Sequence, residues 1–237
     1  MTTPSGQAAA LLAALPMFRR TARGQIAELA RRTVSRHVRA GSVIIRRGER
    51  VPGLMTVRYG LVKISVHGDS ERVIRLVGPG ETFGEAALFL EQPLPVDVAA
   101  LADTALVIVP GEPLLALFDS DPRFARGLLA AVCQRLQAMV ADFEAATVHG
   151  ARARLAAYLR SLAGPAPATA RLPAAKSVIA ARLGMAKETF SRVLRAFRDE
   201  GLVEVAGRDV RILDGARLDA AARLGFRLRP ADPDAQA

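Results

Sequence analysis

Short β-branched segments alternate with glycines between positions 41 and 110. The segments cover residues 43–45, 61–66, 72–77 and 106–109, and glycines recur between them at the spacing of tight turns. Short strands separated by turn residues are typical of antiparallel sheets. This region is therefore predicted to fold as a small barrel or jelly-roll-like β-domain. Residues 8–36, which precede it, are predicted as short helices, the second over 25–36 with Ile26, Leu29 and Ala30 on one face.

Residues 121–148 predict one long helix, because no proline follows Pro122 in this segment. Apolar side chains recur along it with 4-3-4-3 spacing, at Ala125, Leu129, Val132, Leu136, Met139, Phe143 and Ala146. This spacing is typical of a coiled coil, and these seven residues are called the seam. An ordinary helix that packs on its own domain is the alternative. Leu128 and Val140 lie off the seam and are expected to supply a second apolar face. Two apolar faces favour a homodimer, with Cys133 as a buried small apolar residue beside the seam.

Residues 176–199 (KSVIAARLGMAKETFSRVLRAFRD) have the pattern of a helix-turn-helix. A small Ala180 stands where two helices would cross, and Gly184 stands in the turn, where a positive φ favours glycine. Four apolar residues are expected to face inward, namely Ile179, Leu183, Phe190 and Val193. Ala186 is a poor N-cap for the second helix.

The second of these helices predicts a DNA-reading face. Lys187, Glu188, Ser191 and Arg192 share that face by their spacing. A glutamate can accept a hydrogen bond from a cytosine amino group, an arginine can bind guanine with two hydrogen bonds, and a serine can bind a base or a phosphate. The alternative is a solvated charged face with an ion pair between Glu188 and Arg192.

A β-hairpin follows the predicted helix-turn-helix. Two short apolar strands, 202–205 and 210–213, flank a turn at 206–209. Behind a helix-turn-helix such a hairpin is a wing, and its Arg208 is placed for a phosphate contact. Lys187 and Arg195 are further candidates for phosphate contacts, whereas Glu188, Ser191 and Arg192 are the candidates for reading bases.

Charge and composition narrow the class of protein. The chain has 237 residues and a formal net charge of +10, which points to a polyanionic partner. Residues 151–237 hold 16 Lys/Arg and 9 Asp/Glu, a net of +7, so the DNA contact is expected there. The single cysteine excludes a disulfide framework and a four-cysteine iron–sulfur cluster. No export signal or membrane anchor is recognisable, so a cytoplasmic protein without a membrane partner is expected.

The chain resembles the Crp/Fnr superfamily of bacterial transcription regulators over nearly its whole length. The motifs that carry the resemblance are LPMF (15–18), AG (40–41), YGLVKI (59–64), LVGPGETFGEAALF (76–89), ETFSR (188–192), DEGLV (199–203) and GRDVRILD (207–214). The resemblance implies an α+β protein with three parts. These are a cyclic-nucleotide-binding-type β-roll (jelly roll) with N-terminal helices over 1–120, a dimerisation helix over 121–148, and a winged helix-turn-helix over 149–237.

Glu188, Ser191 and Arg192 match the E-x-x-S-R signature of Fnr-like members, which read an inverted repeat of TTGAT-type half-sites. The nearest likeness is to the Dnr type, which implies an activator that responds to nitric oxide through haem, with RNA polymerase as a further partner. A haem often takes a histidine ligand. His37, His67 and His149 are the candidates, and no axial ligand is assigned among them.

The cyclic-AMP branch of the superfamily is a poorer match. Its phosphate cassette has Gly-Glu and, about ten residues later, an Arg-Ser or Arg-Thr pair. Here Gly84 and Glu85 are present, but Pro95 and Val96 occupy the places of that pair. Without the guanidinium and hydroxyl, a cyclic phosphate would be buried with little charge compensation, so cyclic AMP is not expected. Gly84 and Glu85 are instead predicted to form a turn and a local hydrogen bond. A cyclic-nucleotide-responsive regulator and a ligand-binding module that does not act on DNA remain as alternatives.

An enzyme is the rival from another class. It would need a nucleophile with a base, or an acid and a base carboxylate. Cys133 lies in a helical seam, and Glu85 with Asp97 is the one carboxylate pair near a plausible pocket. The sequence therefore favours a regulator over an enzyme.

Overall fold

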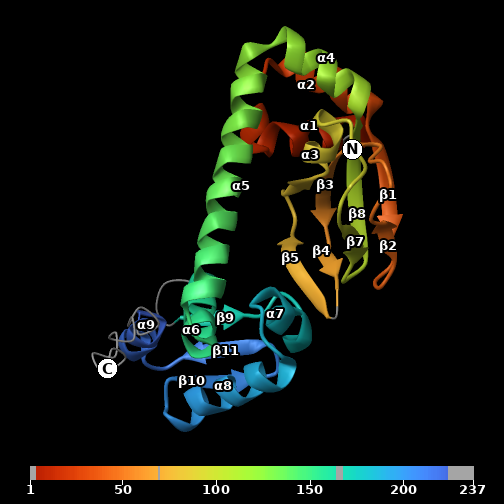
Figure 1. The fold of residues 1–237 in the computed structure, drawn as a ribbon. Helices are drawn as coiled ribbons and strands as arrows, with labels where there is room; N and C mark the ends of the chain where they lie inside the picture. Colours follow the sequence, from red (N-terminus) through yellow and green to blue (C-terminus); the bar gives the residue numbers. More distant parts are fainter. Residues whose placement is uncertain (1–3, 69, 164–167, 224–237) are drawn as a thin grey trace, which may run out of the picture. The chain divides into compact units, whose positions relative to one another are not determined.

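A computed structural model describes residues 4–68, 70–163 and 168–223 of the chain (Figure 1). Three short helical segments come first, α1 (Pro4–Ala14), the 3-10 turn η1 (Pro16–Phe18) and α2 (Arg23–Arg32). Ile26, Leu29 and Ala30 are buried on one face of α2, as predicted. The prediction that this helix continues to Arg36 is wrong, because residues 34–38 pair as a strand with a later segment of the β-domain.

Two four-stranded antiparallel sheets form the β-domain. One has the order β1-β8-β3-β6, and the other has the order β2-β7-β4-β5. The first sheet contains β1 (Val34–Val38), β3 (Gly53–Tyr59), β6 (Thr82–Phe83) and β8 (Thr104–Pro110). The second contains β2 (Val43–Ile45), β4 (Val62–His67), β5 (Glu71–Val77) and β7 (Asp97–Ala100). The predicted jelly-roll-like β-domain is thus confirmed.

Two apolar clusters hold the β-domain together. One lies between the sheets and includes Met55, Val57, Val98 and Leu106. The other packs the opposite side of β3 and β8 against the N-terminal helices, α4 (Gly111–Ser120) and the start of the long helix. The short helix α3 (Glu85–Phe89) connects β6 to the segment before β7. Such burial of apolar surface is the main stabilising contribution to the domain.

The long helix α5 runs over Pro122–Val148 and has 27 residues, which corresponds to about 40 Å. It confirms the predicted long helix. The chain divides into two compact units inside this helix, an N-terminal unit (Met1–Met139) and a C-terminal unit (Val140–Ala237). Phe124 and Leu128 are buried in the N-terminal unit, whereas Val140 is exposed. The second apolar face predicted for α5 is therefore supplied by Leu128 and not by Val140.

The C-terminal unit combines helices with a small three-stranded sheet of order β10-β11-β9. Its helices are α6 (Ala151–Leu162), α7 (Lys176–Arg182), α8 (Lys187–Asp199) and α9 (Gly215–Arg223). Its strands are β9 (Thr169–Arg171), β10 (Val203–Ala206) and β11 (Asp209–Ile212). Helices α7 and α8 with the β10–β11 hairpin confirm the predicted winged helix-turn-helix. No helix in the described part of the chain is long and apolar enough to span a membrane.

Candidate functional site

The turn between α7 and α8 is built as the sequence predicts. Gly184 has a φ of 63°, in the left-handed region that favours glycine. Ile179 and Ala180 are buried on α7, and the amide of Met185 donates to the Ala180 carbonyl at 3.0 Å. On α8 the buried residues are Phe190, Leu194 and Phe197.

Two of the four residues predicted to face inward are less buried than expected. Leu183 and Val193 are only half-buried, whereas Leu194 and Phe197 complete the buried face of α8. Phe190, Leu194 and Phe197 are spaced by four and three residues, so they form one stripe along the helix. The packed stripe fixes the rotation of α8 about its axis and therefore fixes which side chains face solvent.

The solvent-facing side of α8 holds every candidate for DNA contact on this helix. Lys187, Glu188, Ser191, Arg192 and Arg195 are all exposed. Within residues 168–223, none of these five side chains has a hydrogen bond or an ion pair, so the alternative Glu188–Arg192 pair does not form. Positions 188, 191, 192 and 195 are spaced by three or four residues and share one face of the helix. A free row of polar and cationic groups is therefore presented on this helix.

The N-terminus of α8 adds backbone donors to this face. Ala186 is the N-cap and makes no side-chain hydrogen bond to the first turn, as predicted. The first turn of a helix has amide groups without intrahelical acceptors, and these favour anions such as phosphates. Lys187 is in this first turn. The start of α8 is therefore suited to a DNA phosphate.

The β10–β11 hairpin forms the wing. Val203 pairs with Ile212 and Ala206 pairs with Asp209, so the turn consists of Gly207 and Arg208 alone and is tighter than the predicted turn. Gly207 has a φ of 63°. The exposed Arg208 donates from Nε to the Leu172 carbonyl at 3.0 Å, and its Nη2 also contacts the Pro173 carbonyl. The remaining N–H groups of its guanidinium are the ones available to a phosphate.

Two arginines of α6, which sequence reasoning missed, support the helix-turn-helix. Arg154 donates to the His149 carbonyl at 2.5 Å and to the Gly184 carbonyl of the turn at 3.3 Å. Arg152 donates to both carboxylate oxygens of Glu200 at 2.8 and 2.6 Å, and these bonds hold the pKa of Glu200 below its usual value. The Arg152 guanidinium also lies 4.7 Å from the centroid of the Phe197 ring. These contacts connect α6 to the turn before α8 and to the C-terminal end of α8.

Gly84 and Glu85 sit at the start of α3 in the β-domain. Gly84 has a φ of 95°, and a Cβ there would lie 3.1 Å from Met55 Cε and 3.2 Å from the Gly53 carbonyl oxygen. The buried Glu85 forms an ion pair with Arg135 of α5. The turn is present, whereas the hydrogen bond predicted to be local is instead a contact between residues 50 positions apart in sequence.

Asp97, the other carboxylate of the enzyme alternative, lies in a different setting. Its Oδ1 accepts from the Arg47 amide at 2.9 Å, and its Oδ2 lies 3.1 Å from Nδ1 of His67. The pKa of Asp97 is lowered, chiefly by the Arg47 amide bond and also by His67. Glu85 and Asp97 thus have separate partners and do not form an acid–base pair.

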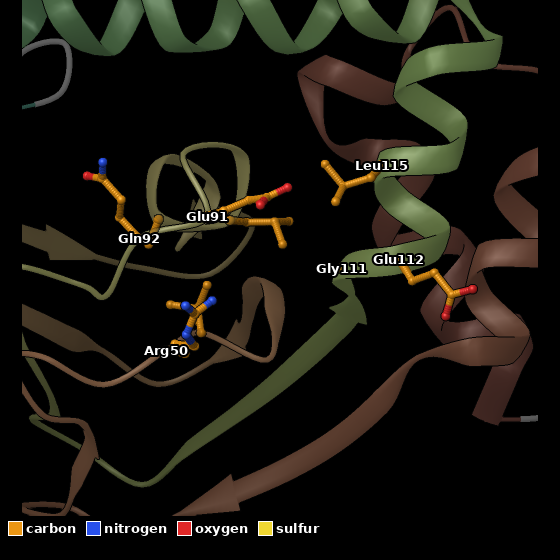
Figure 2. A pocket seen from close by; sticks show the side chains of 9 residues that line it. Arg50, Glu91, Gln92, Gly111, Glu112 and Leu115 are labelled. Atoms are coloured by element: carbon orange, nitrogen blue, oxygen red, sulfur yellow. The ribbon is translucent and has the colours of Figure 1, made fainter.

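Two of the pockets formed by the described residues open on the N-terminal unit. The first has a volume of about 380 Å³ and lies among α3, the start of α4 and the segment before β3, where Figure 2 shows Arg50, Glu91 and Leu115 around it. The second, of about 320 Å³, is formed by η1, the β5–β6 region and α5. No histidine or cysteine lines either pocket.

The three histidines lie apart from both pockets. His37 is exposed on β1, His67 contacts Asp97 and Glu71, and His149 lies between α5 and α6. In the described ranges no three His, Cys, Asp or Glu side chains gather into a potential metal site. The residues of the pockets therefore do not supply the histidine ligand that a haem often takes, and no axial ligand is assigned.

The predicted seam of α5 is exposed in the protomer. Leu129, Val132, Leu136, Met139 and Phe143 are 41–69% exposed, and the side chain of Ala146 lies outside the described residues. Cys133, beside this seam, is also exposed, so the prediction of a buried cysteine is wrong for the protomer. The reason is that Cys133 lies on the outward side of α5, whereas Leu128 points into the core of the N-terminal unit.

Comparison with known proteins agrees with this architecture. Residues 35–121 match the family model of the cyclic nucleotide-binding domain, and residues 153–221 match that of the Crp-like helix-turn-helix domain. The chain is 32% identical over 185 residues to the cyclic AMP receptor protein of Thermus thermophilus, across 76% of this chain and 83% of that protein. It is 30% identical over 195 residues to the transcriptional activator protein FnrA of Stutzerimonas stutzeri, across 79% and 80%.

A solved structure shows the same fold. FixK2 from Bradyrhizobium japonicum superposes with a TM-score of 0.72 at 22% identity, over 80% of this chain and 96% of that one. The chain belongs to the Crp/Fnr family of DNA-binding transcription regulators and is not an enzyme.

Proposed function

We propose that this regulator acts as a homodimer that reads an inverted repeat of TTGAT-type half-sites with helix α8. The observation that carries the proposal is the exposed row Glu188, Ser191 and Arg192, which makes no side-chain hydrogen bond or ion pair within residues 168–223, on a helix whose opposite side is packed. Recognition helices contact base edges with residues near their N-terminus. Glu188, Ser191 and Arg192 all lie in the first two turns of α8.

Each side chain has a role that follows from its donors and acceptors. Arg192 binds a guanine through two hydrogen bonds, and Glu188 accepts from the amino group of a cytosine or adenine. Ser191 assists either contact as donor or acceptor. Lys187, Arg195 and Arg208 bind phosphates, which fixes the position of the helix without reading sequence.

Dimerisation supplies the second half of the recognition. The exposed α5 seam, Leu129 to Phe143 in 3-4-3-4 spacing, is matched to the same seam of a second copy. A symmetric dimer presents two copies of α8, and these match two half-sites about one helical turn apart. Activation by contact with RNA polymerase is part of the same proposal.

The effector is a small molecule that binds the N-terminal unit and shifts the equilibrium of the dimer towards a DNA-binding form. The nitric oxide and haem of the Dnr type stay predictions. Neither of the two pockets is lined by a histidine that could serve as a haem ligand. The relative in Thermus is named a cyclic AMP receptor protein. Here Pro95 and Val96 offer a cyclic phosphate neither a guanidinium nor a hydroxyl, so cyclic AMP is not proposed.

A salt titration of DNA binding tests the proposal. The full chain is titrated onto a TTGAT-N4-ATCAA duplex and onto a scrambled duplex of the same length and composition, at 50–300 mM salt, roughly the range over which phosphate contacts weaken. The expected result is a steep salt dependence on both duplexes with tighter binding to the repeat at each salt concentration. Equal affinity for the two duplexes would contradict sequence reading by α8, and no binding to either would contradict the function itself.

A further inference from the structure

The second pocket of the N-terminal unit carries an inference about the class of effector. Its walls come from three places in the sequence, η1, the β5–β6 region and one side of α5. Positions 84, 85, 95 and 96, which correspond to the phosphate cassette of the cyclic-AMP branch, do not line it. The pocket adjoins these positions without including them, because Arg135 in its wall pairs with Glu85.

Two guanidinium groups line this cavity from opposite walls. Arg75 of β5 donates to the Thr82 carbonyl at 3.0 Å and to Glu81 Oε1 at 3.2 Å, and its side chain is 21% exposed. Arg135 of α5 donates to Thr82 Oγ1 at 3.3 Å and pairs with Glu85, and its side chain is 26% exposed. Of five N–H groups on each guanidinium, two are used in this way within the described residues, which leaves three on each side.

The two cations are close enough to affect one another. The pKa of Arg135 is lowered to about 10, first by burial and then by the positive charge of Arg75, while Glu81 acts in the opposite direction. The Glu81 carboxylate is already held by Arg75 and by the Gly78 amide, which donates to it at 2.6 Å. Like charges at a confined site repel, and an anion placed between them relieves the repulsion.

The rest of the cavity is apolar. Leu15, Pro16 and Met17 line one side, and Ala131 and Ala138 of α5 line the other. A largely apolar cavity of about 320 Å³ with a few convergent polar groups is the usual form of a small-molecule site. Unused guanidinium donors at one end and apolar side chains beside them select a ligand that has an anionic head and an apolar body.

We propose that this pocket binds a small organic anion, with its carboxylate, phosphate or sulfonate between Arg75 and Arg135 and its apolar part against Met17 and Ala131. Guanidinium groups suit such oxyanions because their N–H groups match the spacing of two oxygen atoms. The Thr82 hydroxyl and the Gln134 amide also line the cavity and complete the polar end.

The position of the pocket on α5 connects it to the dimer seam. The pocket takes Ala131, Gln134, Arg135 and Ala138, whereas the seam takes Val132, Leu136 and Met139 from the adjoining side of the same helix turns. A ligand that bridges β5 and β6 to these turns would hold the pocket side of α5 against the β-domain and so fix the direction in which the seam faces. That this alters DNA binding rests on the proposed function, whereas binding of the anion itself does not.

Isothermal titration calorimetry on the full chain tests the site with 1-naphthyl phosphate as the probe and neutral 1-naphthalenemethanol as its uncharged counterpart. We expect the phosphate to bind and the alcohol to bind at least about 10-fold more weakly, since a hydrogen bond to a charged group contributes about 1.5–3 kcal/mol. Arg75→Gln, which leaves the Glu85–Arg135 pair intact, is expected to weaken the phosphate by about 10- to 150-fold. Arg126→Gln removes one charge from an exposed position of α5 outside the pocket and is expected to bind as the wild type does.

A second variant tests the cavity rather than its charge. Ala131→Leu fills the apolar end with both arginines in place, so it is expected to abolish binding while circular dichroism shows a folded chain. The proposal is overturned if the wild type does not bind the phosphate at millimolar concentration, if the alcohol binds equally well, or if Arg75→Gln and Arg126→Gln lose affinity equally. DNA binding is measured separately, so a failure of sequence reading and a failure of the pocket are distinct results.

Discussion

The ion pair between Glu85 and Arg135 predicts that removing the arginine costs more stability than removing the glutamate's charge, because Glu85 is the more deeply buried partner. The Glu85 side chain is 5% exposed and the Arg135 side chain is 26% exposed. Arg135→Met therefore leaves a carboxylate almost without solvent and without its cation, which is expected to destabilise the chain by about 3–5 kcal/mol. Glu85→Gln leaves a guanidinium that still reaches solvent and Thr82 Oγ1, so about 1–3 kcal/mol is expected.

Urea denaturation measures both effects at a fixed protomer concentration, because the stability of a dimer depends on concentration. With a slope of about 1–3 kcal/mol per molar urea, Arg135→Met is expected to lower the midpoint by roughly 1–5 M. The double variant Glu85→Gln/Arg135→Met has no unpaired buried charge, so it is expected to be more stable than Arg135→Met alone. Arg126→Met, at an exposed position on the same helix, is the control and should stay within about 0.5 kcal/mol of the wild type. An Arg135→Met variant as stable as this control, or less affected than Glu85→Gln, would refute the reasoning.

Three further predictions concern the dimer, the wing and acid stability. Leu136→Asp is expected to convert a dimer into a monomer at micromolar concentration in analytical ultracentrifugation and to make Cys133 react faster with a thiol reagent. Ala130→Asp, at an exposed position of α5 outside the seam, is the control and is expected to stay dimeric, whereas a dimeric Leu136→Asp variant would contradict the seam. Gly207→Val forces a β-branched residue to a φ of 63° without a steric clash, so thermal unfolding should show a loss of about 1–2 kcal/mol in the free energy of unfolding. The control Gly24→Ala within α2 should be neutral or stabilising, and equal effects of the two variants would argue against backbone strain. Since the pKa of Asp97 is lowered from 3.8, its carboxylate stabilises the fold above that pH and loses this effect as the pH falls through the lower folded value. The difference in unfolding free energy between the wild type and Asp97→Asn should therefore narrow below about pH 4. A difference that widens there would contradict the assignment.

Periodic patterns predicted most of the fold. The glycine-separated β-branched segments, the unbroken 121–148 helix and the helix-turn-helix spacing correspond to the β-domain, α5 and the α7–α8 pair. Each of these depends on local periodicity, which is present in the sequence itself. The exposed face of α8 follows from the same periodicity, once its packed stripe is known.

Features that depend on tertiary contacts could not be predicted. Thr33 ends α2 early because Val34 pairs with Ile108, a residue 74 positions later in the chain. Cys133 is exposed because the N-terminal unit buries Leu128 and not the seam side of α5. The Glu85–Arg135 pair joins α3 to α5, although Arg135 gives one signal in sequence, as the single charged residue between Arg126 and Asp142.

The central claim, that α8 reads bases, is tested most directly by comparing Arg192→Ala with Arg195→Ala in fluorescence anisotropy. Affinities are measured for the TTGAT-N4-ATCAA duplex and for its scrambled counterpart at one salt concentration. Arg192→Ala is expected to lose about 1–3 kcal/mol on the repeat and much less on the scrambled duplex, whereas Arg195→Ala weakens both equally. Equal losses on the two duplexes for Arg192→Ala would contradict the account.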